Sequence, residues 1–510
     1  MAGNGWQYQQ PAWSKYARYK QPWFWVACTA IGLVLYLYRP WGLYFLNDDF
    51  VHIPQSAQLI LGQNNSIRGG NDFSLYLDTR LFGQQAWGYH LTNLILHIAA
   101  SLLLVAYVRK MGQLLNPATP GWLPALTGLL FFVYPFHSES VFWILGRTGS
   151  LSTLLFLGSL LLYLKAHQGW LTIVGSWLLF FAALTVYESV WIWPAAIAWI
   201  IILKSKQQRQ GVLQRYWIGA AGFAALFTAF MVYRYQVQQE VLGHYELQPT
   251  GQQRQWLLSL AGNYARLLGR SLVMPMQSSL WFTIGSLVAV SVMAYCLLAI
   301  TLRNKQWYWA LFIVSMFGVA LLPYITLGID THGVESERYL YLPSLYTCMA
   351  LAYMLVHVKR QALRVGGTLA VLAYFIVALW QSSLRFREAS YYVQQTFNYL
   401  AQPPAGSTLL FTHLPADCGG AVMLRLGLAE GIQWLHAHKN FKNIWVQNWQ
   451  EYNQLKIAPV RKLQTGDYGQ LKALKVYSAL KNDTLMVKVS SDSVWHFEYS
   501  IQGLQITTPR

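Results

Sequence analysis

Residues 89–108 read YHLTNLILHIAASLLLVAYV, a stretch that holds two histidines but no acid, lysine or arginine. Its length matches the roughly 20 apolar residues that an α-helix needs to cross a bilayer. Runs of similar character recur along the chain and are separated by short polar loops. We therefore predict a mainly helical, multi-pass membrane protein with about eleven spans, at residues 23–38, 89–108, 122–136, 141–164, 170–186, 188–203, 216–233, 280–302, 307–327, 341–358 and 365–383.

The composition and the charge pattern support this class. The chain is 55% hydrophobic and 11% charged, whereas soluble domains average roughly 25% charged residues. The net charge of +18 has a topological origin, because 15 of the 37 cations gather in loops that contain no acid. This is the positive-inside signature of a cytoplasmic face, and it predicts a cytoplasmic N-terminus and an outer C-terminus. The other 22 cations nearly balance the 19 acids, so nucleic-acid binding is not expected. The 15 cations are Lys15, Arg18, Lys20, Arg109, Lys110, Lys165, Lys204, Lys206, Arg209, Arg215, Arg303, Lys305, Lys359, Arg360 and Arg364.

The chain divides into two predicted domains. Residues 1–383 form the helical membrane domain, and residues 384–510 form a small α+β domain on the outer face. The outer domain is indicated by shorter apolar runs and by a helix expected near residues 422–436. Within the membrane domain we expect interfacial helices at residues 51–61 and 256–273. The predicted strands cover residues 408–411, 444–446, 474–477, 485–489 and 496–501.

The first outer loop begins with an unusual acidic pair, Asp48 and Asp49, about ten residues after the first span. Under the predicted threading, all of the acids lie on the outer side of the membrane. Carboxylates close to a bilayer are costly and usually functional, so this pair is a candidate for a base that works at the membrane surface. A hydrated turn in which the aspartates bond to nearby backbone is the alternative reading.

Further polar side chains collect on the same outer rim. Carboxylates and imidazoles can act as general bases, and a guanidinium can hold a phosphate with two hydrogen bonds. Each loop alone also fits a hydrated turn or an arginine that reaches toward the headgroups. A metal site that uses the acidic pair with His52, or His137 with Glu139, stays open, although no cysteine cluster supports it. The candidate binding residues are His137, Glu139, Arg147, Glu188, Glu337 and Arg338.

Four stretches resemble a known family. They are NDDF at 47–50, WGYHLTNLILHIAASLLL at 87–104, VYPFHSESVFWILGR at 133–147 and ESERYLYLPSL at 335–345. They are similar to the type-C (GT-C) membrane glycosyltransferases, and within these to the O-mannosyltransferase-like branch that includes the tetratricopeptide-containing transmembrane O-mannosyltransferases and bacterial relatives. The resemblance covers residues 44–383. It implies an acidic catalytic role for Asp48 or Asp49.

The resemblance also implies substrate-site roles for His137, Glu139, Arg147 and Arg338. Two departures from the family pattern matter. Gly149 stands where the family often has an acid two residues after the Gly-Arg pair, and the chain has no tetratricopeptide repeats. The acceptor of that branch therefore does not transfer to this chain.

Together these features lead us to expect an inverting, metal-independent glycosyltransferase of the bacterial inner membrane. Asp48 would be the base, supported by Asp49, and Arg338 or Arg147 would neutralise the leaving phosphate. The donor would be a polyprenyl-monophosphate sugar, and the acceptor a lipid, a glycan or a protein. No cofactor is expected, while a role for Mg²⁺ or Mn²⁺ stays open. Two alternatives are a transporter or flippase of lipid-linked glycans and a metal-dependent transferase with a pyrophosphate-linked donor.

Overall fold

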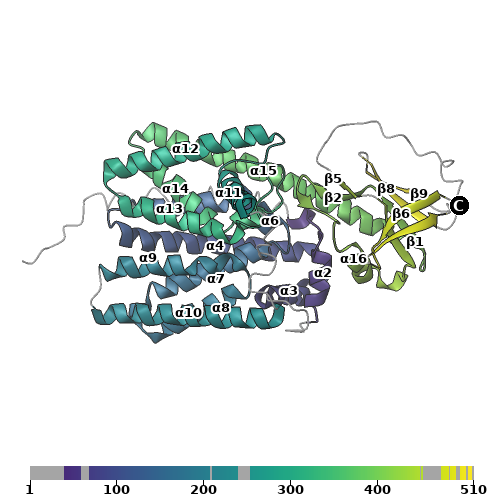
Figure 1. Cartoon of the computed structure of the whole chain (residues 1–510), viewed down its shortest axis with the longest axis horizontal. Coiled ribbons are helices and arrows are strands. Elements are labelled where there is room, and N and C mark those ends of the chain that lie inside the picture. The colour runs from purple at the N-terminus through teal and green to yellow at the C-terminus, as the bar shows by residue number, and fades with distance from the viewer. Residues whose placement is uncertain are drawn as a thin grey trace, which may run out of the picture.

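The computed structural model describes residues 40–58, 68–206, 210–238, 253–447, 449–451, 472–481, 483–489, 494–500 and 503–507. The first predicted span, at residues 23–38, lies outside the described residues. A bundle of long helices forms one part of the molecule, and a small sheet domain extends from one end of it (Figure 1).

The prediction of a helical, multi-pass membrane protein is confirmed. Each of the ten other predicted spans contains an α-helix. Among the described residues, six helices are long and apolar enough to cross a bilayer, and a bent pair raises this to seven. Three shorter apolar helices accompany them. The helices of the predicted spans are α4 (Ala86–Leu115), α5 (Leu123–Phe132), α7 (Arg147–Tyr163), α8 (Trp170–Leu184), α9 (Trp193–Ser205), α10 (Gln210–Gln238), α12 (Ser279–Asn304), α13 (Trp307–Leu321), α14 (Ser344–Val356) and α15 (Gln361–Tyr399).

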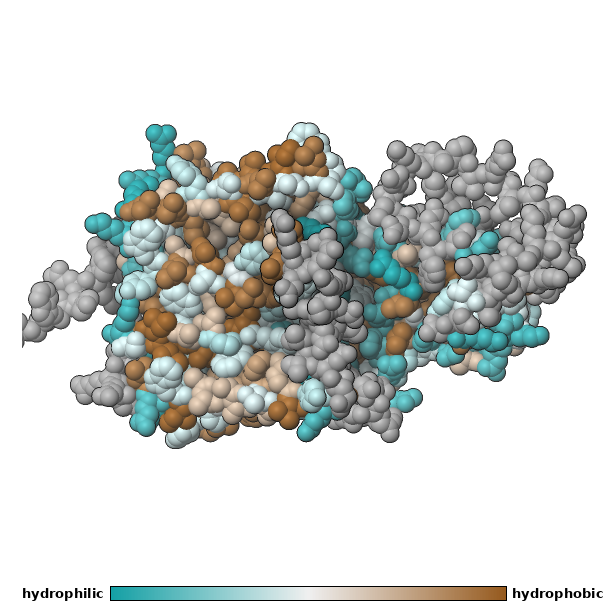
Figure 2. All heavy atoms as spheres, in the orientation of Figure 1, coloured by the Kyte–Doolittle hydropathy of each residue, from teal (hydrophilic) through white to brown (hydrophobic). Residues whose placement is uncertain are grey.

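The bundle surface fits a lipid environment. Figure 2 shows hydrophobic residues over the side of the helical part, with hydrophilic residues at its far end and toward the sheet domain. Helix α12 is the extreme case, because only 6% of its most apolar window is buried inside the protein. Leu280, Leu287 and Tyr295 of this helix are all largely exposed. Apolar surface of this extent in contact with water would be unfavourable, whereas acyl chains cover it at no such cost.

Three further helices lie in loops that were predicted to face the outer side. Helix α2 (Asp49–Ser56) and helix α11 (Gln253–Arg270) coincide with the two predicted interfacial helices, within a few residues at each end. Helix α3 (Gly69–Phe82) was not predicted. It packs between α2 and α4, and its inner face carries the buried residues Asn71, Leu75 and Asp78.

A sharp bend precedes α7 and shapes the outer end of the bundle. The short helices η4 (Pro135–His137) and α6 (Ser138–Phe142) meet α7 at 103°. The side-chain amide of Asn93 donates to the carbonyls of Trp143 and Ile144, at 2.9 and 3.3 Å. Gly146 lies so close to the preceding helix that a Cβ there would be 1.9 Å from the carbonyl oxygen of Glu139. The bend is therefore fixed by backbone packing.

The C-terminal region contains two sheets. All five predicted strands are present, whereas β2, β3, β5 and β9 were not predicted. The larger sheet has the order β7-β6-β4-β1-β8-β9, with β1 parallel to both neighbours, and the smaller has the order β3-β2-β5. Helix α16 (Leu428–Leu435) falls inside the region where a helix was expected. The strands are β1 (Thr408–Thr412), β2 (Leu414–Cys418), β3 (Ala421–Val422), β4 (Asn443–Val446), β5 (Trp449–Glu451), β6 (Lys472–Ser478), β7 (Asp483–Val489), β8 (Val494–Ser500) and β9 (Gly503–Thr507).

The two parts are joined by a continuous helix. Helix α15 runs on past residue 383, the predicted domain boundary, and ends at Tyr399. Aromatic contacts tie the outer part to the first outer loop. Phe50 meets Phe397 at 4.6 Å between ring centroids, and Phe45 meets Trp434 at 4.9 Å.

We expect Gly146→Ala to destabilise the protein by about 1–3 kcal/mol or more, because the added methyl group meets backbone that cannot rotate away. Gly366→Ala in α15 is the control, since a Cβ there meets nothing within 4 Å and alanine favours a helix. Thermal unfolding in detergent measures both variants. Equal melting temperatures for the two variants would contradict the close backbone contact.

Candidate functional site

The two aspartates of the pair have different surroundings. Asp49, in the first turn of α2, is completely buried. Its Oδ2 accepts from the amide of Leu46 at 2.9 Å, and its Oδ1 accepts from the amide of Leu145 at 3.2 Å. Burial raises the pKa of Asp49 well above its ordinary value, although the two amides oppose the shift. Asp49 thus fastens the start of α2 to the bend before α7 and is closed to a substrate.

Asp48 remains partly open. It occupies the N-cap position of α2, where an aspartate usually caps the helix, yet among the described residues its side chain makes no capping hydrogen bond. Its Oδ1 instead accepts from the side-chain amide of Asn47 at 2.8 Å. Burial raises the pKa of Asp48, while the positive charges of His52, Arg338 and Arg425 act in the opposite direction. In the part of the chain that the structure describes, the Asp48 carboxylate therefore forms neither a helix cap nor the turn that was the alternative interpretation of the acidic pair.

Arg338 and Glu139 form a clamp beside Asp48. The guanidinium of Arg338 donates directly to one carboxylate oxygen of Glu139. The backbone amide of Arg338 donates to the other oxygen at 2.9 Å. The guanidinium lies over the rings of Trp143 and Tyr339, at 5.1 and 4.9 Å from their centroids. The Arg338 side chain keeps 25% of its surface exposed. The guanidinium is thus held in a defined orientation and still reaches solvent.

Glu337, the preceding residue, faces inward and pairs with Arg270 of α11 at 2.6 Å, and both side chains are fully buried. Glu337 also accepts from the hydroxyl of Ser138. Burial raises the pKa of Glu337, to about 7, against the effect of Arg270. Arg270 further donates to the carbonyls of Asp330 and Val273. The pair fixes the short helix η9 (Glu337–Leu340) that carries Arg338, so Glu337 is placed to support the site and not to touch a substrate.

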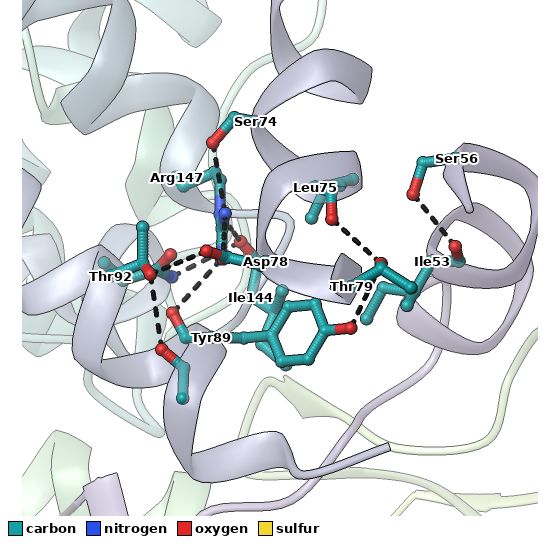
Figure 3. Close-up of polar contacts among 12 residues, drawn as sticks. Ile53, Ser56, Ser74, Leu75, Asp78, Thr79, Tyr89, Thr92, Ile144 and Arg147 are labelled. Carbon is teal, nitrogen blue, oxygen red and sulfur yellow. Dashed lines mark hydrogen bonds and ion pairs between the residues drawn. The ribbon is translucent and has the colours of Figure 1, made fainter. Parts of the chain in front are cut away.

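Arg147 is buried in a separate network (Figure 3). Its guanidinium pairs with Asp78 of α3 at 2.5 Å, and the Arg147 side chain has no exposed surface. Further donors bind Ser74 at 3.1 Å and the carbonyl of Tyr89 at 3.1 Å, while Thr92 donates to Asp78 at 2.8 Å. The expectation that Arg147 neutralises a donor phosphate therefore has no support from the geometry. Among the predicted arginines, Arg338 is the accessible one.

The two remaining candidates also lie inside the protein. His137 is fully buried, and its Nε2 bonds to the hydroxyl of Ser344 at 2.7 Å. Glu188 binds two guanidinium groups, one from Arg68 and one from Arg234, each at 3.0 Å. The structure therefore pairs Glu139 with Arg338, whose charge acts on Asp48, and it places His137, Arg147 and Glu188 in buried contacts.

Three residues that matter here were not among the predicted site residues. Asp78, Arg270 and Arg425 pair with Arg147, Glu337 and Glu335, respectively. Two of them carried a usable signal. Asp78 repeats with Asn71 and Leu75 at helical spacing. Arg270 lies on the predicted interfacial helix at residues 256–273. No group of three or more metal-ligating side chains occurs within the described ranges.

We expect Arg147→Ala to cost about 3–5 kcal/mol, because it leaves the Asp78 carboxylate buried without a partner. Replacing both residues by apolar ones, as Asp78→Leu with Arg147→Met, should recover much of that loss. Unfolding in detergent gives the stabilities, and binding of a polyprenyl phosphate gives the second readout. Loss of lipid-phosphate binding in a stably folded double variant would return Arg147 to the list of donor ligands.

Comparison with known proteins gives local sequence similarity to one family. No family model matches the chain. It is 31% identical over 126 residues to protein O-mannosyl-transferase TMTC2 of Mus musculus, which is 25% of this chain and 14% of the relative. It is also 31% identical over 164 residues to protein O-mannosyl-transferase Tmtc2 of Drosophila melanogaster. This match covers 28% of this chain and 17% of the relative. The chain thus spans a small part of the length of these relatives.

Among solved structures, ArnT from Cupriavidus metallidurans bound to undecaprenyl phosphate is similar with a TM-score of 0.47 and 12% identity, over 84% of this chain and 93% of that one. The resemblance of this chain to the O-mannosyltransferases, first indicated by the four sequence stretches above, is confirmed by the local sequence similarity.

Proposed function

We propose that this protein is a glycosyltransferase that moves a sugar from a polyprenyl-monophosphate donor to an acceptor hydroxyl at the outer membrane surface. The observation that carries the proposal is the environment of Asp48. It is a half-buried carboxylate on which the charge of the partly exposed Arg338 acts, at the proposed outer end of a membrane-spanning bundle. A base and a phosphate ligand thus share one location where a lipid-linked donor can arrive from the bilayer.

The chemistry follows from these two groups. Asp48 takes the proton of the acceptor hydroxyl, whose oxygen attacks the anomeric carbon. The bond between that carbon and the phosphate oxygen breaks, and the polyprenyl phosphate leaves with the electron pair. Arg338 meets the charge on this phosphate with two donors in a fixed plane. A single displacement of this kind inverts the anomeric centre. A phosphate is a good leaving group, so no general acid is required.

Other residues of the site keep these groups in place. Asp49 ties the α2 start to the bend before α7 through two backbone amides. Glu139 orients the guanidinium of Arg338, and Glu337 holds η9 from the inner side. Such support matters because a displacement of about 1 Å can cost roughly 100-fold in rate.

The names of the relatives indicate a substrate class for the first assays. They are protein O-mannosyl-transferases, so mannose as the sugar and a protein hydroxyl as the acceptor are the first combination to test. We further propose a bacterial inner-membrane location with the outer domain in the periplasm, supported by the acid-free, cation-rich loops. The bilayer itself is a partner, because it presents the donor.

We expect Asp48→Asn to lower transfer by about 10²–10⁴-fold, because asparagine keeps the shape but cannot accept the proton. Asp49→Asn should lower the rate less, since one oxygen remains to accept from a backbone amide. The assay measures release of undecaprenyl phosphate from undecaprenyl-phosphate mannose by purified protein in detergent, which also excludes a transporter as the source of turnover. Near-normal turnover of Asp48→Asn would remove this residue as the base.

Arg338→Ala should weaken donor binding more than Arg338→Lys, because lysine keeps the charge but loses the second donor of the guanidinium. Arg385→Ala is the matched control. Its guanidinium donates to the carbonyl of Gly419 at 2.9 Å and belongs to the outer part of α15. A fall in melting temperature with unchanged affinity for undecaprenyl phosphate would assign Arg338 to loop packing alone.

A further inference from the structure

The residue before the proposed base has a strained backbone and a fully used side chain. Asn47 is buried and adopts φ 48°, a left-handed conformation that asparagine tolerates better than most residues. Its side-chain nitrogen donates to Asp48 Oδ1 at 2.8 Å. Its side-chain oxygen accepts from the amide of Leu426 at 2.7 Å, and its own amide donates to the carbonyl of Met423 at 2.6 Å. Asn47 thus connects Asp48 to the outer domain.

The outer-domain partner is the segment 423–427, which links the small sheet to α16. Gly427, at φ 79°, lies against Asn47 so closely that a Cβ would be 2.5 Å from the Asn47 carbonyl oxygen. The same Cβ would be 3.1 Å from the Cβ of Phe50 in α2. A side chain at Gly427 would therefore push the segment away from the acidic pair.

The same segment also contacts the loop that carries Arg338. Arg425 binds Glu335 with two nitrogens, at 2.9 and 3.3 Å, and reaches Asp417 of β2 at 3.3 Å. Nearby, the amide of Val334 donates to the carbonyl of Gly419 at 3.1 Å. One five-residue segment therefore touches both sides of the site, next to Asp48 and three residues before Arg338.

We propose that Asn47 is the positioning residue of Asp48, and that the outer-domain segment 423–427 sets the distance between Asp48 and Arg338. The inference rests on the proposed function, since it assumes that Asp48 is the base. It assigns the outer domain a part in completing the site, through specific contacts with the acidic loop.

The donor of Asn47 also acts on the charge of Asp48. A hydrogen bond to the ionised carboxylate favours the form that a base requires. The charged and titratable groups around Asp48 are Asp49 and His52 from α2, Arg338 from η9 and Arg425 from the outer domain. Replacing Asn47 by aspartate keeps the acceptor for Leu426 but exchanges the donor for a negative charge.

Two glycine variants test the contact with the outer domain. Gly427→Ala and Gly406→Ala carry the same backbone strain, because φ is 79° and 78°, but a Cβ at Gly406 meets nothing within 4 Å. We expect Gly427→Ala to lower kcat for undecaprenyl-phosphate mannose by about 10–100-fold, with little change in KM. Gly406→Ala should keep the wild-type kcat. Equal kcat values for the two variants would overturn the role of the segment.

Asn47→Asp tests the effect on Asp48 without relying on turnover. Dicyclohexylcarbodiimide modifies protonated carboxyls, and mass spectrometry of the labelled protein locates the modified residue. We expect labelling of Asp48 to persist to higher pH in Asn47→Asp than in wild type, because the added charge favours the protonated form. Asn47→Gly keeps the left-handed backbone but removes the side chain. It should lower kcat, and because it adds no negative charge it should not extend Asp48 labelling to as high a pH as Asn47→Asp does. Asn116→Asp, in the loop after α4, is the control and should leave labelling unchanged.

The outcomes separate the two proposals. Full activity of Asp48→Asn would overturn the proposed function, whatever the labelling shows. An inactive Asp48→Asn, together with wild-type labelling and kcat in Asn47→Asp, would overturn the positioning role alone. A lower melting temperature of Asn47→Asp with unchanged labelling and kcat would leave Asn47 as a folding contact and would equally contradict the inference.

Discussion

The cost of burying charge determines how the loops of the helical part are held together. An isolated carboxylate in a low-dielectric interior is highly unfavourable, and removing the partner from a buried pair costs about 3–5 kcal/mol. Within the helical part, four carboxylates whose side chains are at most 5% exposed each meet at least one guanidinium. Every pair joins segments far apart in the sequence, so the pairs fix the outer loops against one another. They are Asp78 with Arg147, Glu139 with Arg338, Glu188 with Arg68 and Arg234, and Glu337 with Arg270.

The acidic pair departs from this pattern in a way that separates its two members. Asp49 is as buried as the paired carboxylates, yet backbone amides and not a guanidinium satisfy it. Asp48 is partly exposed, and the charges of His52, Arg338 and Arg425 favour its ionised form against the effect of burial. Two adjacent like charges are unfavourable, and giving each a different environment reduces that cost. Under the proposed function, the buried Asp49 serves the structure while the partly exposed Asp48 serves the chemistry.

The sequence predicted the helices well because a membrane span needs only local information, namely length and apolarity. Local sequence information could not predict which charged residues of the different loops would pair. Glu139 and Arg338 are 199 residues apart, and nothing in the two loops indicates which partner each will choose. Strand β2 escaped prediction because it is short and contains Pro415, which normally argues against a strand. Asp78 could have been predicted, since Asn71, Leu75, Asp78 and Phe82 repeat at helical spacing, but no helix was predicted between residues 62 and 88.

The length of α15 explains how the outer domain can act on a site in the first outer loop. Its 39 residues correspond to about 58 Å of helix, roughly twice the thickness of the hydrocarbon core. A helix that continues without a break past the bilayer transmits its direction to the sheets that follow it. The aromatic contact between Phe50 and Phe397, near the end of α15, then sets a second fixed point on α2. The continuous helix and this aromatic contact fix the position and the orientation of the C-terminal domain. Its segment 423–427 can therefore form hydrogen bonds of 2.6 and 2.7 Å with Asn47, which a flexibly tethered domain would not hold in place.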